Sequence, residues 1–133
     1  MELTRKEREY LVAISEFYSS FPPRLIDIAK KVHVKPPTAY NLIKRLSVKG
    51  LVNEHKGIIV VTSKGKNAYS GLIMAHRCVE TLFSRAGMKK DHACKEAQKI
   101  DYMLTREDAK LLLKFLGNPK NCPHGRPIVI KVR

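Results

Sequence analysis

The sequence predicts a mainly α-helical protein with a small β-hairpin near its middle. Apolar residues recur at helical spacing through most of the 133 residues, and β-branched runs replace this spacing between positions 51 and 61. Hydrophobic residues make up 44% of the chain and charged residues 29%, which is the composition of a globular rather than a disordered protein.

Two short helices are expected first. Thr4 can cap the first helix, and Glu7, three residues on, completes a capping box. Its apolar face consists of Tyr10, Leu11, Ile14, Phe17 and Tyr18. Pro22 and Pro23 end this helix, because proline cannot continue the hydrogen-bond ladder. A second helix of about two turns follows, with Leu25, Ile28, Ala29 and Val32 on its apolar face.

A third helix leads into the hairpin. It begins at Pro36 or Pro37, and Gly50 is a natural C-terminal cap. Its apolar stripe is formed by Ala39, Leu42, Ile43 and Leu46. Strands are then expected at Leu51-Val52 and at residues 58–61, joined by a loop over residues 53–57. Three helices and a hairpin in this order predict a winged helix-turn-helix, whose third helix enters the major groove of DNA.

The second half is also expected to be helical. A long helix from Lys64 to Ala86 is capped by Thr62 or Ser63 and ended by Gly87, and a second helix runs from about Lys90 to Leu104. A third helix begins after a capping box of Thr105 with Asp108 and ends near Gly117. The β-branched residues 128–132 favour an edge strand at the end of the chain.

The charge of the chain indicates a polyanionic partner. Lysine and arginine total 26 against 12 acidic residues, so the formal net charge is +14. Between Arg24 and Lys66 ten basic residues are opposed only by Asp27 and Glu54, which places the expected electrostatic footprint on the predicted winged helix. Nucleic acid is the first candidate, and a merely cationic surface is the alternative.

The third helix and the hairpin tip supply the candidate DNA contacts. These are Lys35, Pro37, Thr38, Tyr40, Asn41, Lys44 and Arg45 on the helix and Lys56 at the tip. Lysines can neutralise phosphates, and the Asn41 amide can pair bidentately with adenine. Since winged helices also serve as protein-interaction modules, a protein partner remains the alternative.

Several classes of protein are excluded. No apolar run approaches the roughly 18 residues of a membrane span, and residues 1–10 hold no apolar signal-peptide region. Cys78, Cys94 and Cys122 cannot all pair and form no CxxC motif, so we expect a reducing cytoplasm. No catalytic motif or glycine-rich phosphate loop is present, and we expect no enzymatic activity.

Metal-ligand residue types recur at helical spacing in the second half. His76 and Glu80 are four residues apart on one predicted helix, so they share a face. Cys94, Gln98 and Asp101 share a face of the next. Bringing the two faces together would gather N, S and O ligands suited to a transition metal, although single His and Cys residues in helices more often serve packing.

Several stretches in order resemble one family. They are Glu9-Tyr10-Leu11, residues 37–52 through the third helix, residues 61–66, residues 76–83 and the ending Cys122-Pro123-His124-Gly125-Arg126-Pro127-Ile128. Together they resemble the DtxR/MntR family of metal-dependent transcriptional repressors over residues 4–128. The resemblance implies a winged-helix DNA-binding domain, here residues 1–71, and a helical dimerisation and metal-binding domain, here residues 72–133.

The resemblance also implies two metal sites. The ancillary site matches His76 and Glu80, and Cys94 stands where the family has a histidine. The primary site matches Glu9 and an E/C-x-x-E-H pattern, at which this chain has Gln98, Asp101 and Tyr102. Because Gln98 and Tyr102 are weaker ligands, we expect the surviving site to consist of His76, Glu80 and Cys94 with Asp101.

The expected cofactor is a divalent transition metal, Fe²⁺ or Mn²⁺, with Zn²⁺ and Co²⁺ as alternatives; thiolate and imidazole favour iron, zinc or cobalt over manganese. The resemblance implies a homodimeric repressor on a palindromic operator, in the short form without an SH3-like domain. A metal-independent winged-helix regulator with a degraded site is the alternative. Cys122 and His124, two apart in the tail, are expected to form a structural turn.

Overall fold

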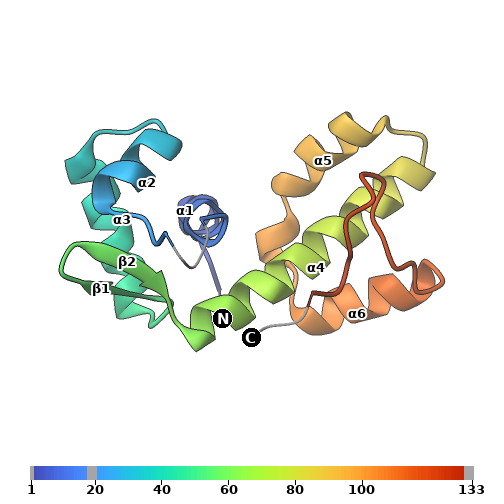
Figure 1. The fold of residues 1–133 in the computed structure, drawn as a ribbon. Coiled ribbons are helices and arrows are strands. Elements are labelled where there is room, and N and C mark those ends of the chain that lie inside the picture. Colours follow the sequence, from blue (N-terminus) through green and yellow to red (C-terminus); the bar gives the residue numbers. More distant parts are fainter. Residues whose placement is uncertain (1, 18–20, 131–133) are drawn as a thin grey trace. The chain divides into compact units, whose positions relative to one another are not determined.

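The protein is mainly α-helical, as predicted, and its computed structural model describes residues 2–17 and 21–130. The elements in order are α1 (Arg5–Ser15), α2 (Leu25–Lys31), α3 (Pro36–Val48), β1 (Val52–His55), β2 (Ile58–Val61), α4 (Ser63–Arg85), α5 (Lys90–Gln98), the 3₁₀-helix η1 (Asp101–Met103) and α6 (Arg106–Phe115) (Figure 1). The chain divides into two compact units, one of residues 3–69 and one beginning at Ser70, so the boundary falls inside α4.

Local capping fixes the helices of the N-terminal unit. The Thr4 hydroxyl accepts a hydrogen bond from the Glu7 N–H at 3.2 Å, and the Glu7 carboxylate accepts one from the Thr4 N–H at 2.9 Å. The predicted capping box is therefore confirmed. Pro36 and Pro37 occupy the first turn of α3, where a missing N–H is harmless. Tyr18, expected on the apolar face of α1, lies outside the described residues.

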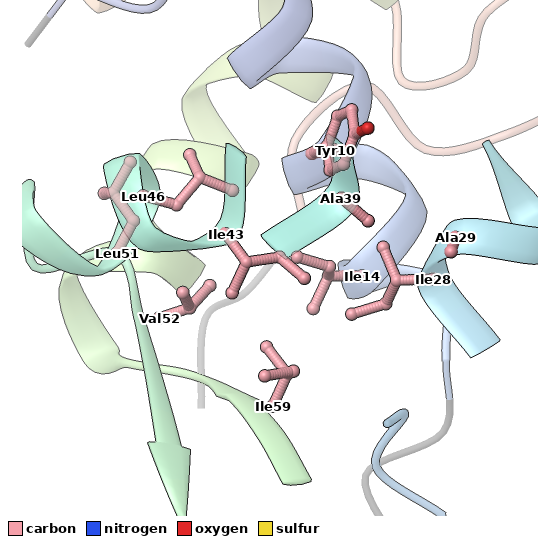
Figure 2. Packing of buried hydrophobic residues seen from close by; sticks show 10 residues of the cluster. All are labelled: Tyr10, Ile14, Ile28, Ala29, Ala39, Ile43, Leu46, Leu51, Val52 and Ile59. Carbon is pink, nitrogen blue, oxygen red and sulfur yellow. The ribbon is translucent and has the colours of Figure 1, made fainter. Parts of the chain in front are cut away.

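One apolar core holds the three helices against the hairpin. Figure 2 shows its ten buried side chains, which come from α1, α2, α3, the turn after α3 and both strands: Tyr10, Ile14, Ile28, Ala29, Ala39, Ile43, Leu46, Leu51, Val52 and Ile59. The apolar stripe predicted for α3 contributes Ala39, Ile43 and Leu46 to this core, while Leu42 is partly buried. Burying this stripe leaves the polar face of α3 exposed to solvent.

The hairpin is tighter than the sequence suggested. The expected loop over residues 53–57 is wrong, because Asn53, Glu54 and His55 pair with β2 in an antiparallel ladder. The turn consists of Lys56 and Gly57, with φ of 51° and 80°. Two successive left-handed residues form the turn whose twist matches that of paired strands, so β1 extends to its tip.

The hairpin is also fixed to the segment before α2. The Ile59 N–H donates to the Pro23 carbonyl at 2.8 Å, and Arg24 forms an isolated bridge with Ile58. The Arg24 guanidinium donates to the Lys56 carbonyl at 3.4 Å. The exposed Lys56 side chain is therefore presented by a braced turn.

Helix α4 organises the C-terminal unit (Figure 1). A second, smaller apolar cluster comprises Met74, Ala75, Cys78, Ala109, Cys122 and Ile128, drawn from α4, α6 and the C-terminal segment. The Thr62 hydroxyl accepts from the Gly65 N–H at the start of α4, and Thr105 forms the predicted capping box with Asp108 at the start of α6. None of the helices in the described ranges is long and apolar enough to cross a lipid bilayer.

Two expected elements of this unit are wrong. Helix α5 ends at Gln98 instead of continuing to Leu104, because the backbone turns at Ile100 (φ −130°) and Asp101 starts η1. Asp101 is thereby buried and removed from the helix face of Cys94 and Gln98. No strand forms over residues 128–130, and Lys131 and Val132 lie outside the described residues.

A buried carboxylate joins α1 to α3. Glu7 is 1% exposed, and its oxygens lie 2.6 Å from Lys49 Nζ and 3.3 Å from Arg45 Nη2. Burial by itself raises the pKa of Glu7. The hydrogen bonds from Lys49 and the Thr4 N–H, with the charges of Lys49 and Arg45, outweigh burial and lower this pKa below its ordinary value of 4.5.

The variant Glu7→Gln is expected to lower the free energy of unfolding by about 1–2 kcal/mol at pH 7, because it removes a charge-assisted hydrogen bond from a buried site. A depressed folded-state pKa stabilises the fold above pH 4.5, and this contribution is lost as the pH falls through the folded-state pKa. Urea unfolding at pH 7 and at about pH 3 measures both effects. Glu16→Gln, which breaks the exposed pair with Lys31, is the control and should change stability little; equal losses in the two variants would contradict the account.

Candidate metal centre and nucleic-acid interface

Three ligand-type side chains meet inside the C-terminal unit. His76 and Glu80 lie one turn apart on α4, and Cys94 faces them from α5. His76 Nε2 lies 3.5 Å from the Cys94 sulfur and 3.8 Å from a Glu80 carboxylate oxygen. One donor atom from each residue lies within 4.8 Å of the other two, and His76 and Glu80 are buried. The structure therefore brings together the three residues expected for the ancillary site.

Asp101 lies behind His76 rather than among these donor atoms. Its carboxylate is 2.9 Å from His76 Nδ1, and Asp101 is fully buried. A proton on Nδ1 donates to this carboxylate, so the Nε2 lone pair faces Cys94 and Glu80. Carboxylate–histidine pairs of this kind orient metal-binding imidazoles and raise their basicity. The end of α5 at Gln98 is what allows Asp101 to reach this position.

The three donors fit a divalent transition metal. They offer one imidazole nitrogen, one thiol and one carboxylate, which is a set suited to Fe²⁺, Co²⁺ or Zn²⁺. Burial and the adjacent Glu80 carboxylate raise the pKa of the Cys94 thiol above its ordinary value. A bound cation would hold this sulfur as a thiolate, so binding would release a proton.

The other expected metal ligands have different surroundings. Gln98 is exposed, and its amide nitrogen lies 3.9 Å from the Cys94 sulfur. Tyr102 is half-buried in η1. Glu9 belongs to α1 in the N-terminal unit, where its carboxylate pairs with Lys6 at 3.4 Å. Gln98 is thus the member of the expected primary site that lies beside Cys94.

Cys122 and His124 are residues that the sequence reasoning left out of the site. Their expected turn is present, since the Gly125 N–H donates to the Cys122 carbonyl at 2.8 Å and Gly125 has a φ of 77°. Their side chains, however, reach Glu80, and the donor atoms of the three residues lie within 4.8 Å of one another. The available signal was the Cys-x-His spacing; what the sequence could not supply was the packing of this turn on α4.

The candidate nucleic-acid interface lies on the N-terminal unit. All eight expected contacts are exposed: Lys35, Pro37, Thr38, Tyr40, Asn41, Lys44, Arg45 and Lys56. Lys35 precedes α3 as its N-cap, so the basic and polar side chains cluster around the first turns of the helix. This is the part of a recognition helix that reaches base edges in helix-turn-helix proteins.

Arg45 differs from the other expected contacts because it already has partners. Its guanidinium lies 3.3 Å from the Glu7 carboxylate and donates to the Thr4 hydroxyl at 3.3 Å. The position of its charge is therefore set by α1.

Comparison with known proteins relates both units to regulators. Residues 62–130, more than half of the chain, match the family described as "Iron dependent repressor, metal binding and dimerisation domain". An HTH-type transcriptional regulator of Aeropyrum pernix is 36% identical over 107 residues, covering 80% of this chain. The chain spans 59% of the length of this relative.

Solved structures show the same fold. A hypothetical protein from Sulfolobus solfataricus superposes with a TM-score of 0.85 and 32% identity, covering 96% of this chain and 100% of that one. A manganese-dependent transcriptional repressor in complex with manganese gives a TM-score of 0.76 and 27% identity, covering 92% of this chain and 57% of that one. The chain therefore belongs to the iron-dependent repressor family, the DtxR/MntR family of metal-dependent regulators.

Proposed function

We propose that this chain is a DNA-binding transcriptional repressor whose affinity for its operator is controlled by a divalent transition metal. The observation that carries the proposal is the buried cluster of His76, Glu80 and Cys94, which lies within the region matched by the metal-binding and dimerisation domain. The exposed polar face of α3 supports the DNA-binding half of the proposal, as does the net charge of +14.

The donor set determines the choice of metal. The Cys94 thiolate and the His76 imidazole favour Fe²⁺, Co²⁺ or Zn²⁺, whereas Mn²⁺ prefers carboxylate, carbonyl and water ligands. Fe²⁺ is the proposed physiological ion because this chemistry agrees with the description of the family. All three cysteines are free, which suits action in a reducing cytoplasm.

A second copy of the chain is the proposed partner at α6. Leu111 and Phe115 lie one helical turn apart and are 69% and 80% exposed, while Ala109 on the same helix is buried in the core. Large exposed apolar side chains of this kind mark interaction surfaces. A two-fold dimer would present two winged helices to a palindromic operator.

The rival function is that of a winged-helix regulator independent of metal. Gln98 and Tyr102 favour it, because they stand where the family has stronger ligands. The retained ligands of the other site favour metal control, since by linkage metal and DNA raise each other's affinity by the same factor.

Binding to the DNA upstream of its own gene tests the function. At fixed salt, fluorescence anisotropy is measured with a chelator and then with Fe²⁺, Mn²⁺, Co²⁺ or Zn²⁺ added singly. One metal should tighten binding tenfold or more, about 1.4 kcal/mol of coupling, and His76→Ala should abolish this gain without changing metal-free binding. Equal, tight binding with chelator and with every metal would instead support the rival.

Asp101→Asn tests how His76 is positioned. Replacing the carboxylate weakens the acceptor on Nδ1, so affinity for Co²⁺ should fall about 10–100-fold, as for other outer partners of metal-bound histidines. Isothermal titration calorimetry of the whole chain gives the affinity. Gln98→Ala removes an exposed amide from the same site and serves as the comparison, with less than a threefold change expected; the opposite ranking would make Gln98 the ligand and overturn the assignment.

The double variant Leu111→Asp, Phe115→Asp tests the dimer. Two charges in the apolar patch should leave a monomer at micromolar concentration, while the wild type sediments as a dimer. Lys110→Glu places a charge change on the same helix without removing apolar surface and should remain dimeric. Analytical ultracentrifugation separates the cases, and a dimeric double variant would exclude this patch as the interface.

A further inference from the structure

A second group of metal-ligand side chains adjoins the first. Glu80, Cys122 and His124 each place a donor atom within 4.8 Å of the other two, and Glu80 is shared with the group of His76 and Cys94. His124 Nδ1 lies 3.1 Å from the Glu80 carboxylate. Cys122 is 6% exposed, so its thiol is enclosed next to this carboxylate.

We propose that the C-terminal turn over residues 122–125 forms a second metal position, in which Glu80, Cys122 and His124 bind a divalent transition-metal ion beside the one at His76, Glu80 and Cys94. Glu80 would then contribute to both positions. Sharing this carboxylate is how the inference rests on the proposed function, and the residues specific to each position allow the two to be tested apart.

The surroundings of the two imidazoles support the second position. His76 has Asp101 on Nδ1, and its Nε2 faces the first group of donors. His124 has Asp91 on Nε2 at 2.9 Å, and its Nδ1 faces Glu80. Each ring is thus backed by a carboxylate and directs its other nitrogen toward Glu80, which is the arrangement that outer carboxylates create around metal-bound histidines.

The turn that carries Cys122 and His124 is held in place by its backbone. The Cys122 N–H donates to the Arg126 carbonyl at 2.8 Å, and Asn121 forms an isolated bridge with Pro127. The Arg77 guanidinium of α4 donates to the Pro127 carbonyl. The backbone that positions the two side chains is therefore closed on itself and tied to the helix that bears Glu80.

The local charges suit two cations. Glu80, Asp91 and Asp101 bring three carboxylates to this region, and Cys94 and Cys122 add two thiols that a metal would deprotonate. The formal charge of the five groups, −5 after deprotonation, offsets the +4 of two divalent ions. Thiolate, imidazole and carboxylate together favour Zn²⁺, Co²⁺ or Fe²⁺ at the second position as at the first.

Co²⁺ is the probe for the experiment, because thiolate-to-cobalt charge transfer reports each cysteine ligand. The whole chain is titrated under reducing, oxygen-free conditions while near-ultraviolet absorbance and bound metal are measured. The wild type should bind two equivalents, and Cys122→Ser should bind one and lose part of the charge-transfer band. His124→Asn should also weaken the second equivalent at least tenfold, and its side chain is only partly buried, so it is suited to replacement.

Cys78→Ser is the matched control. This thiol is buried in the same unit, donates to the Ala109 carbonyl and has a pKa raised by burial to about 11, and it belongs to neither group of donors. Its replacement should leave the two equivalents and the absorbance unchanged. Circular dichroism of each metal-free variant establishes that it is folded before titration.

The outcomes separate the two sites. A single equivalent in the wild type, lost in Cys94→Ser and unchanged in Cys122→Ser and His124→Asn, would overturn the second position and leave the proposed function intact. A charge-transfer band that depends on Cys122 and His124 but not on Cys94 or His76 would support the second position and contradict the first. If Cys122→Ser does not fold, the second equivalent of His124→Asn decides alone.

Discussion

The buried carboxylate of Glu80 is the group around which the chemistry of the C-terminal unit is arranged. It is 2% exposed on α4, and burying a charge without partners would be strongly unfavourable. His76 approaches it from one turn earlier on the same helix, and His124 approaches it from the C-terminal turn. The apolar cluster of this unit is small and includes alanine and cysteine side chains, so polar contacts with α4 carry much of its cohesion. A metal ion held here would add its binding free energy to that of folding.

The N-terminal unit is held together differently. Ten buried apolar side chains and the Glu7 carboxylate fix α3 against α1 and the hairpin, with no ligand required. The polar face of α3 and the hairpin tip are therefore preformed within their own unit. Under the proposed function, control by metal acts on the C-terminal unit, where charged side chains gather around Glu80, while the surface that would meet DNA keeps its local structure.

Periodicity and capping residues predicted most of the fold, because helix stripes and capping boxes are local properties of the sequence. Thr4 with Glu7 and Thr105 with Asp108 cap the helices as expected. The errors arose where tertiary contacts decide. Asp101 leaves the expected helix and reaches His76, and Lys56 with Gly57 makes a shorter turn than the polar stretch suggested. His76, Glu80 and Cys94 were predictable from spacing, whereas the place of Cys122 and His124 depends on how the C-terminal segment packs on α4.

The central claim is that sulfur and imidazole ligands from this cluster hold the regulatory ion. X-ray absorption spectroscopy of the whole chain loaded with Zn²⁺ measures this directly, because sulfur and nitrogen or oxygen neighbours differ in distance, at about 2.3 Å and about 2.0–2.2 Å. The account predicts a mixed shell with sulfur and the multiple-scattering signature of imidazole, and loss of the Cys94 sulfur in Cys94→Ser. A shell of nitrogen or oxygen alone in the wild-type protein would contradict it.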